Sequence, residues 1–323
     1  MKYRKFGDTK VSEIGLGTWQ LGADWGYVND STADKVLATA VENGVNFFDT
    51  ADCYGEGLAE NRLGRFVKKL SSDVVIATKL GRFPRPGWPN NFSQEQFRKH
   101  TENSLKRLGL ETLDLTQVHC PPTELLQKGE LFDWLRTLKQ EGKIKQFGLS
   151  VESMEEAQIC LKQEGLASLQ IIFNIFRQKA ITTIFKEAQE KQVAIIVRLP
   201  LASGLLSGQM NEKSKFSEND HRNFNRDGEK FNVGETFSGL PFEKGLELIE
   251  SLKRLTPENL SQFALRWILD FEAVSVVIPG SKNPQQVVDN CAASTLPRLE
   301  EKTHKAINDF YIKEVASFIR GKY

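Results

Sequence analysis

The sequence predicts an α/β protein whose strands and helices close into a single (β/α)8 (TIM) barrel spanning residues 1–323. Short apolar runs alternate with amphipathic stretches along the whole chain. Runs such as VVIAT, VAIIV and SVVIP are continuously apolar, which is typical of a parallel sheet buried on both faces. A chain of 323 residues can form one barrel. An open, doubly wound sheet is the competing architecture.

The expected strands are, in chain order, residues 13–17, 45–48, 74–78, 113–118, 146–149, 169–173, 193–197 and 275–278. The expected helices are residues 32–43, 60–69, 93–108, 124–142, 153–164, 180–191 and 257–271, with another beginning near Asn283. Strand and helix thus alternate through eight repeats, as a barrel requires.

Capping signals support several of these boundaries. Ser31 or Thr32 is expected to open the first helix, and Ser93 with a glutamine three residues later suits a capping box. Pro257 fits the first position of its helix, where a missing N–H costs nothing. Gly44 and Gly142 follow helix ends, where glycine accepts a left-handed turn.

Three segments interrupt the alternation: the proline-rich residues 81–92, the long polar residues 201–239 and the tail after Leu299. Long loops in compact domains are usually functional or mobile. We expect all three at or near the C-terminal end of the barrel.

The overall composition excludes several classes of protein. Lys+Arg is 43 and Asp+Glu is 42, a net charge of +1, so no general attraction to nucleic acid or anionic membranes is expected. Cys53, Cys120, Cys160 and Cys291 are widely spaced, which disfavours a disulfide framework, and no metal site is expected. No apolar run approaches the roughly 18 residues of a membrane span. We expect a reduced, cytoplasmic protein that binds a small molecule, with its oligomeric state open.

Titratable residues gather where active sites of barrels form, at the carboxyl ends of strands. Asp49 ends the second expected strand and Tyr54 follows in the same loop, while Lys79 ends the third strand and His119 the fourth. Each alone has an ordinary structural interpretation, such as a helix cap, loop packing, a solvated strand end or a core histidine. Their occurrence on three consecutive loops favours a shared catalytic site.

These four residue types suit the reduction of a carbonyl group. A tyrosine hydroxyl can donate the proton, although its usual pKa is about 10. A neighbouring ammonium is expected to lower that pKa, and a carboxylate keeps the ammonium in place. A histidine can hold the carbonyl oxygen and help to relay the proton.

The motifs NFFDTADCYG, VVIATKLG and LDLTQVHCPP resemble those of the aldo-keto reductases. The resemblance runs from YRKFGDTKVSEIGLGTWQLG to IPGSKNPQQVVDN and covers nearly the whole chain. It implies that Asp49, Tyr54, Lys79 and His119 form the catalytic tetrad, that a hairpin of residues 1–10 closes the bottom of the barrel, and that NADPH/NADP+ is the cofactor. It also implies a small carbonyl substrate, for which we expect a pocket lined by Trp19, Tyr54, Trp88 and His119.

The segment after the last expected strand suits an anion, because a serine, Lys282 and a helix N-terminus lie together there. By resemblance, the phosphate side of the cofactor would contact Gly280, Ser281, Lys282 and Gln286, and the adenine Asn290. The remaining expected contacts are Thr18 and Trp19 near the nicotinamide ribose, Asp49, Ser150 and Gln170 near the nicotinamide, and Pro200, Leu201, Ser203, Gly204 and Leu206 over the pyrophosphate.

Two positions depart from the family pattern. Val151 stands where many members have an asparagine that binds the carboxamide. Arg198 stands where an aromatic ring usually stacks on the nicotinamide, and we expect it to face the cofactor pocket. It could stack near the nicotinamide, which we favour, fork onto a carboxylate or phosphate of the substrate, or bridge an acidic residue of the long loop.

Two other functions stay open at this point. Lys79 could be the nucleophile of a Schiff-base aldolase, although this leaves the segment around residues 280–290 unexplained. The chain could also be a slow or non-catalytic NADPH-binding regulatory subunit.

Overall fold

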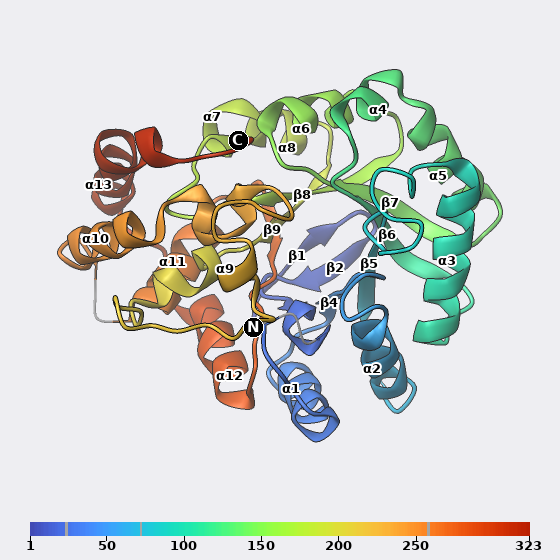
Figure 1. The fold of residues 1–323 in the computed structure, drawn as a ribbon, viewed down its shortest axis with the longest axis horizontal. Coiled ribbons are helices and arrows are strands. Elements are labelled where there is room, and N and C mark those ends of the chain that lie inside the picture. The colour runs from blue at the N-terminus through green and yellow to red at the C-terminus, as the bar shows by residue number, and fades with distance from the viewer. Residues whose placement is uncertain (23–24, 72, 257–258) are drawn as a thin grey trace.

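Eight parallel strands form the barrel (Figure 1), in a computed structural model that describes residues 1–323 except 23–24, 72 and 257–258. The strands are β3 (Leu16–Gly17), β4 (Phe47–Asp49), β5 (Val75–Leu80), β6 (Leu113–His119), β7 (Ile144–Ser150), β8 (Leu166–Ile172), β9 (Ala194–Arg198) and β10 (Val274–Val277). Each pairs with its neighbour in chain order. Parallel bridges between Ile14 and Val277 and between Gly17 and Gly280 join the first strand segment to the last. The sheet is therefore closed, and the doubly wound alternative is wrong.

A hairpin of β1 (Tyr3–Phe6) and β2 (Thr9–Ser12) covers one end of the barrel, as expected. Phe6 and Val11 are buried in one apolar cluster with residues of the barrel strands, so the barrel interior is a packed core. The guanidinium of Arg4 donates to the carbonyl oxygens of Phe271, at 3.1 Å, and Val274, at 2.8 Å. These bonds attach the hairpin to the start of β10.

Helices surround the strands on the outside of the barrel (Figure 1). They are α1 (Asp30–Glu42), α2 (Leu58–Val67), α3 (Gln94–Leu108), α4 (Thr123–Lys128), α5 (Glu130–Gln140), α6 (Met154–Leu161), α7 (Ala180–Thr183), α8 (Phe185–Glu190), α10 (Phe242–Lys253), α11 (Leu260–Leu269), α12 (Pro284–Ala292) and α13 (Glu301–Phe310). Helices α10 and α13 were not among the expected elements. Within the described chain, no helix combines the length and apolar character needed to cross a bilayer.

Two expected helices are each divided in two. The helix expected over residues 124–142 breaks at Gly129, which has φ +81° and separates α4 from α5. The helix expected over residues 180–191 breaks at Ile184, where φ is −128°. The expected start at Pro257 lies outside the described residues, and Asn259 caps α11 by accepting from the Gln262 N–H at 3.1 Å.

Some caps also differ from the expectation. Neither Ser31 nor Thr32 opens α1, because the Asn29 side chain accepts from the Thr32 N–H at 2.8 Å. Ser93 caps α3, but the side-chain oxygen of Gln96 has no partner among the described residues, so the reciprocal half of a capping box is missing. Gly44 and Gly142 take left-handed φ values of 83° and 73°, as expected.

The three irregular segments lie at the C-terminal end of the barrel. Residues 81–92 follow β5 directly, and the long loop follows β9 and includes the short helix α9 (His221–Phe224). The tail returns to the same end, where the Arg320 N–H donates to the Gly239 oxygen at 3.1 Å and Lys322 pairs with Glu156 at 2.9 Å. The loops thus converge at the carboxyl ends of the strands.

Candidate active site

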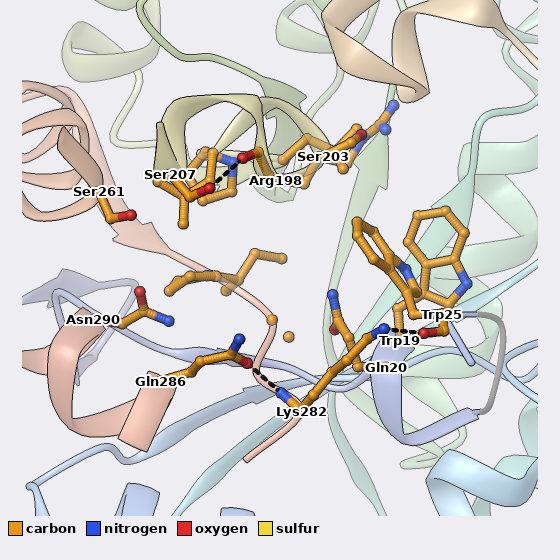
Figure 2. A pocket seen from close by; sticks show the side chains of 18 of the residues that line it. Trp19, Gln20, Trp25, Arg198, Ser203, Ser207, Ser261, Lys282, Gln286 and Asn290 are labelled. Carbon is orange, nitrogen blue, oxygen red and sulfur yellow. Dashed lines mark hydrogen bonds between the residues drawn. The ribbon is translucent and has the colours of Figure 1, made fainter. Parts of the chain in front are cut away.

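A cavity of about 790 Å³ opens at the carboxyl ends of the strands, beneath the long loop (Figure 2). The expected site residues that line it are Trp19, Asp49, Tyr54, His119, Gln170, Arg198, Pro200, Leu201, Ser203, Gly204, Gly280, Lys282, Gln286 and Asn290. The expected residues outside its lining are Thr18, Lys79, Trp88, Ser150, Leu206 and Ser281. Most of these six are buried directly behind the lining, and Trp88 is the exception.

Asp49, Tyr54, Lys79 and His119 come together at one end of this cavity. Lys79 is buried, and its Nζ donates to Asp49 Oδ1 at 2.5 Å, to the Thr50 oxygen at 3.0 Å and to the Tyr54 hydroxyl at 3.1 Å. The rings of Tyr54 and His119 are edge to face with centroids 6.1 Å apart. Lys79 therefore lies outside the cavity lining and forms hydrogen bonds with Tyr54 and Asp49, while Tyr54 and His119 face the cavity.

The carboxylate of Asp49 is fixed by further bonds from the barrel interior. Its Oδ2 accepts from Gln117 at 3.0 Å and from Gln170 at 2.8 Å, and Gln170 also donates to Gln117 at 3.0 Å. Gln117 lies on β6 two residues before His119, a spacing that points both side chains to the barrel interior. The sequence analysis missed Gln117, although this alternation could have identified it.

The environment of the site keeps Tyr54 and His119 uncharged. Burial, Asp49, Cys53 and Glu235 raise the pKa of Tyr54 well above its usual 10, against the opposing charge of Arg198. The net pKa of Tyr54 is therefore raised in the protein alone and not lowered as expected, because burial and the nearby negative groups dominate. Burial, with Arg82, Lys79 and Arg198, holds the pKa of His119 well below 6.5. At neutral pH, Tyr54 is a phenol and His119 a neutral imidazole.

The opposite part of the cavity carries the positive charge and the backbone groups that suit phosphates (Figure 2). Asn283 caps α12, and the Lys282 N–H donates to Gln286 Oε1 at 2.7 Å. The Lys282 Nζ reaches across to the Trp25 carbonyl oxygen. Burial and the nearby Arg222 lower the pKa of Lys282. Two cations held this close would be stabilised by an anion between them.

Arg222 lies on α9 in the long loop, and the sequence analysis missed it because nothing local links this loop to α12. Its guanidinium lies over the Trp25 ring at 4.7 Å and pairs with Asp220 at 2.6 Å. Gly280 faces the Gln20 side chain so closely that an added Cβ would lie 1.9 Å from it. A larger residue at this position would have to displace the end of the Gln20 side chain.

Ser281 and Asn290 bind each other, with the Asn290 amide donating to Ser281 Oγ at 3.3 Å. Ser150 is buried, and its Oγ accepts from the Cys120 thiol at 3.7 Å. Val151 is also buried and makes hydrogen bonds only through its backbone. Its N–H donates to the Gln170 carbonyl oxygen, and its own carbonyl oxygen accepts from the Arg198 guanidinium.

Arg198 ends β9 and lines the cavity, but its guanidinium is held by the protein. It donates to the Val151 oxygen at 3.3 Å and to Cys120 Sγ at 3.7 Å, and lies 3.7 Å from Glu235 Oε1. This is the third of the expected alternatives, in which Arg198 bridges an acidic residue of the long loop. Stacking near the nicotinamide, the alternative that we favoured, needs one face of the guanidinium to be free, and these contacts restrict its orientation.

Trp19 and Trp88 have different environments. Trp19 lines the cavity and stacks on Tyr54 with centroids 5.8 Å apart and an angle of 17°. Trp88 is 57% exposed and lies outside the lining, so the expectation that it lines the substrate pocket is wrong. The loop that carries it folds back on itself, because the Asn91 amide donates to the carbonyl oxygens of Gly81 and Phe83.

Comparison with known proteins gives a consistent match across the chain. Residues 13–312 match the model of the aldo/keto reductase family. The chain is 29% identical over 301 residues to Aldo-keto reductase YhdN of Bacillus subtilis, covering 89% of this chain and 87% of the relative. It is 28% identical to Aldo-keto reductase yakc [NADP(+)] of Schizosaccharomyces pombe, covering 95% and 90%. The structure of the glycerol dehydrogenase AKR11B4 of Gluconobacter oxydans superposes with a TM-score of 0.79 at 28% identity, covering 99% of this chain and 98% of the other.

Proposed function

Since the chain belongs to the aldo/keto reductase family, we propose that it reduces aldehydes or ketones to alcohols, with Tyr54 as the proton donor. The chain is an NADP-dependent oxidoreductase, and NADPH/NADP+ is its cofactor. The observation that carries the proposed mechanism is the bonded chain Asp49–Lys79–Tyr54 at the end of the cavity.

The cavity suits an extended dinucleotide on the evidence of its own residues. Lys282 and Arg222 supply positive charge at one part, close to the N-terminus of α12. Arg198 has a buried Nε without a partner among the described residues, and Gly204, with φ +97°, lines the cavity without a side chain. Lys282, Arg222, Gln286 and Asn290 would hold the phosphates and adenine, and Gln170 and Trp19 the nicotinamide end.

When bound, the dinucleotide would supply a hydride to the carbonyl carbon. As that carbon becomes tetrahedral, its oxygen takes the proton of the Tyr54 hydroxyl, and the C=O π pair becomes the lone pair that binds this proton. The raised pKa of Tyr54 keeps the proton on the phenol until the carbonyl oxygen takes it. Lys79, 3.1 Å from the hydroxyl, stabilises the phenolate that is left, and Asp49 keeps the ammonium in position.

His119 acts on the substrate without a change of charge. Because its pKa is held well below 6.5, it is a neutral imidazole whose ring N–H can hold the carbonyl oxygen. The Cys53 thiol lies 3.7 Å from its Nδ1.

The geometry argues against the aldolase. The Lys79 Nζ is paired with Asp49, bonded to Thr50 and Tyr54, and its side chain is fully buried. A Schiff base needs a free amine that reaches the substrate carbon. The regulatory alternative predicts that the protein binds NADPH without reducing a carbonyl substrate, and an assay of NADPH consumption distinguishes it from the enzyme. We also propose a cytoplasmic location, because the cysteines of the described chain form no disulfide with one another.

The test is Tyr54→Phe, which removes the proton and retains the ring. We expect kcat to fall by roughly 10²-fold or more, the usual scale of general acid catalysis, with NADPH affinity unchanged. Tyr27→Phe is the matched control, because Tyr27 is 86% exposed. NADPH consumption with a panel of aldehydes, ketones and sugars measures the effect. A Tyr54→Phe enzyme that works at the normal rate refutes the proposed donor, and a wild-type protein that binds NADPH but reduces none of the panel favours the regulatory alternative.

A further inference from the structure

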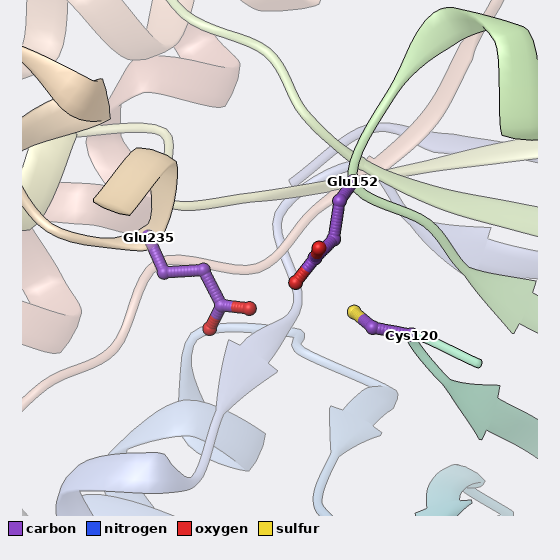
Figure 3. Close-up of side chains that lie close together, drawn as sticks. All are labelled: Cys120, Glu152 and Glu235. Atoms are coloured by element: carbon purple, nitrogen blue, oxygen red, sulfur yellow. The ribbon is translucent and has the colours of Figure 1, made fainter. Parts of the chain in front are cut away.

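Two polar clusters lie beside the cavity, and the first of them consists of ion pairs. Cys120, Glu152 and Glu235 converge with their donor atoms within 4.8 Å of one another (Figure 3). Arg82, however, donates to both carboxylates, at 2.7 Å and 2.9 Å, so a cation would have to displace a guanidinium. Burial raises the pKa of Cys120 to about 11, which leaves a neutral thiol. This cluster is therefore an internal ion-pair network.

The second cluster joins Asp49, Gln117 and Gln170, which come from three different strands and are all buried. Strand β7 lies between β6 and β8 in the sheet, and its residue paired with Gln117 is Gly148. Because Gly148 has no side chain, Gln117 and Gln170 can meet across β7, with Gln170 Nε2 3.0 Å from Gln117 Oε1. The three polar side chains thus form one continuous network in the barrel interior.

The carboxylate of Asp49 decides which way round both amides lie. An ionised carboxylate accepts hydrogen bonds and cannot donate them. The atoms that face Asp49 Oδ2 are therefore amide nitrogens, that of Gln117 at 3.0 Å and that of Gln170 at 2.8 Å. The second N–H of Gln170 donates to Gln117 Oε1. Both N–H groups of Gln170 are engaged, so its amide plane is held at two points.

The remaining polar atom of Gln170 is its oxygen Oε1, which can only accept. Gln170 lines the cavity, whereas Gln117 lies behind it. This oxygen is not enclosed by the protein, and no residue of the described chain donates to it. The cavity wall therefore presents an acceptor at this point, and a ligand group that carries an N–H satisfies it.

We propose that Gln117 is a positioning residue, which fixes the Gln170 oxygen toward the cavity and makes the site select dinucleotides with an N–H donor at the nicotinamide end. The inference rests on the proposed function, in which Gln170 faces the nicotinamide. The carboxamide of NADP+ carries such a donor, and an acetyl group in its place does not. Without Gln117, Gln170 keeps only its bond to Asp49, so its amide can tilt and the selection weakens.

Gln117 also connects the nicotinamide end of the cavity to the residues of proton transfer. Its amide nitrogen donates to Asp49 Oδ2, and the other oxygen of this carboxylate pairs with Lys79. Gln117 and Lys79 are direct neighbours on the paired strands β6 and β5. One side chain behind the cavity therefore orients groups on both sides of the reacting centre.

The experiment compares the binding of NADP+ with that of its 3-acetylpyridine analogue, in which a methyl group replaces the carboxamide nitrogen. Quenching of tryptophan fluorescence measures both dissociation constants without turnover, because Trp19 and Trp25 line the cavity. For the wild type, we expect NADP+ to bind roughly 10-fold more tightly, the scale of a buried acceptor left without a donor. Gln117→Met keeps the length of the side chain and removes both of its hydrogen bonds, so it should reduce this ratio to about threefold or less.

Gln117→Glu is the conservative variant. At about pH 6 its carboxyl is protonated, since burial and the nearby Asp49 disfavour a second negative charge, so it can donate to Asp49 and accept from Gln170. It should therefore retain the selection that Gln117→Met loses. Thr116→Val is the matched control, because Thr116 is the buried neighbour on β6 and its hydroxyl has no partner within the described part of the chain.

Equal binding of the two dinucleotides by the wild type, an unchanged ratio in a folded Gln117→Met, or a lost selection in Gln117→Glu overturns the inference. If Gln117→Met does not fold, Gln117→Asn takes its place, because it keeps the polarity but is one carbon too short to bond both partners, and it should lose the selection as well. Failure of the proposed function would be seen instead as normal turnover by Tyr54→Phe, a result that leaves both dissociation constants unaffected.

Discussion

Replacing Lys282 tests how the protein selects NADPH over NADH. The side chain is half-buried at the cavity, close to Arg222 and to the N-terminus of α12. If it binds the 2′-phosphate, Lys282→Ala removes a charged hydrogen bond from NADPH and nothing from NADH, which lacks this phosphate. Such a bond contributes about 1.5–3 kcal/mol.

The structure places the expected loss at the lower end of that range. Without the cofactor, the Lys282 Nζ already donates to the Trp25 carbonyl oxygen, so binding exchanges one hydrogen bond for another. Arg222 also remains in the variant and still attracts the phosphate. We therefore expect a loss of about 1.5 kcal/mol, which is roughly a tenfold increase in the Kd of NADPH.

The assay is titration of NADPH and NADH against tryptophan fluorescence, because Trp19 and Trp25 both line the cavity. Lys213→Ala is the matched control, since Lys213 is an exposed lysine of the long loop outside the lining. An equal loss for both cofactors would mean a general defect of the site. An unchanged Kd for NADPH would show that Lys282 does not meet the phosphate.

Three further predictions concern Trp88 and Arg198 at the loop end of the barrel and Asp270 near the hairpin at the other end. Trp88→Ala should leave the preference among bulky carbonyls and the NADPH affinity unchanged, because Trp88 is 57% exposed; substrate profiling checks this, and a changed preference contradicts it. Arg198→Leu should lower the free energy of unfolding, measured in urea, by about 1–3 kcal/mol, because Glu235, Cys120 and the Val151 oxygen each lose a partner. The ratio of NADP+ to NADPH affinity should stay constant in this variant. A selective tightening of NADP+ binding would instead support stacking of Arg198 on the nicotinamide. Burial opposes it, but the pKa of the Asp270 carboxyl is lowered because His304 and the Leu299 N–H form hydrogen bonds with the carboxylate. The stability that the ionised carboxylate contributes is therefore present above the usual pKa of 3.8 and is lost as the pH falls through the lowered pKa. The loss of stability caused by Asp270→Asn at neutral pH should accordingly become smaller at acid pH, as measured in acid denaturation curves.

The barrel and the tetrad could be predicted because both depend on local pattern. Each apolar run and each strand-end residue is visible within a few positions, and a closed parallel sheet brings consecutive strand ends together. Gln117 could have been added by the same reasoning, from its alternation with His119 on β6. The apolar spacing of PFEKGLELIESLKRL likewise predicts α10, although the irregular loop before it obscures where the helix begins.

Helix breaks were harder to predict, because they depend on single backbone angles. Gly129 takes φ +81° within a stretch whose apolar spacing reads as one continuous helix. An added Cβ there would meet nothing within 4 Å, so no steric conflict forces the break. The two helices pack against different elements, α4 against α6 and α5 against α3 and β7, a tertiary effect that overrides local preference.

The same distinction explains why the contacts of the Arg198 guanidinium could not be predicted from the sequence. At the end of β9, its position relative to the cavity follows from the strand pattern, and this much was predicted. The direction of its guanidinium depends on Glu235, which lies 37 residues later in a loop without periodicity, and on Arg82, which competes for the same carboxylate oxygen. An arginine in a nearly buried site takes whichever acceptors the fold supplies, because an unpaired charge there is costly. A family position that usually holds an aromatic ring therefore becomes part of an ion-pair network here, and the same network brings Glu235 to the cavity, where a carboxylate could not remain without it.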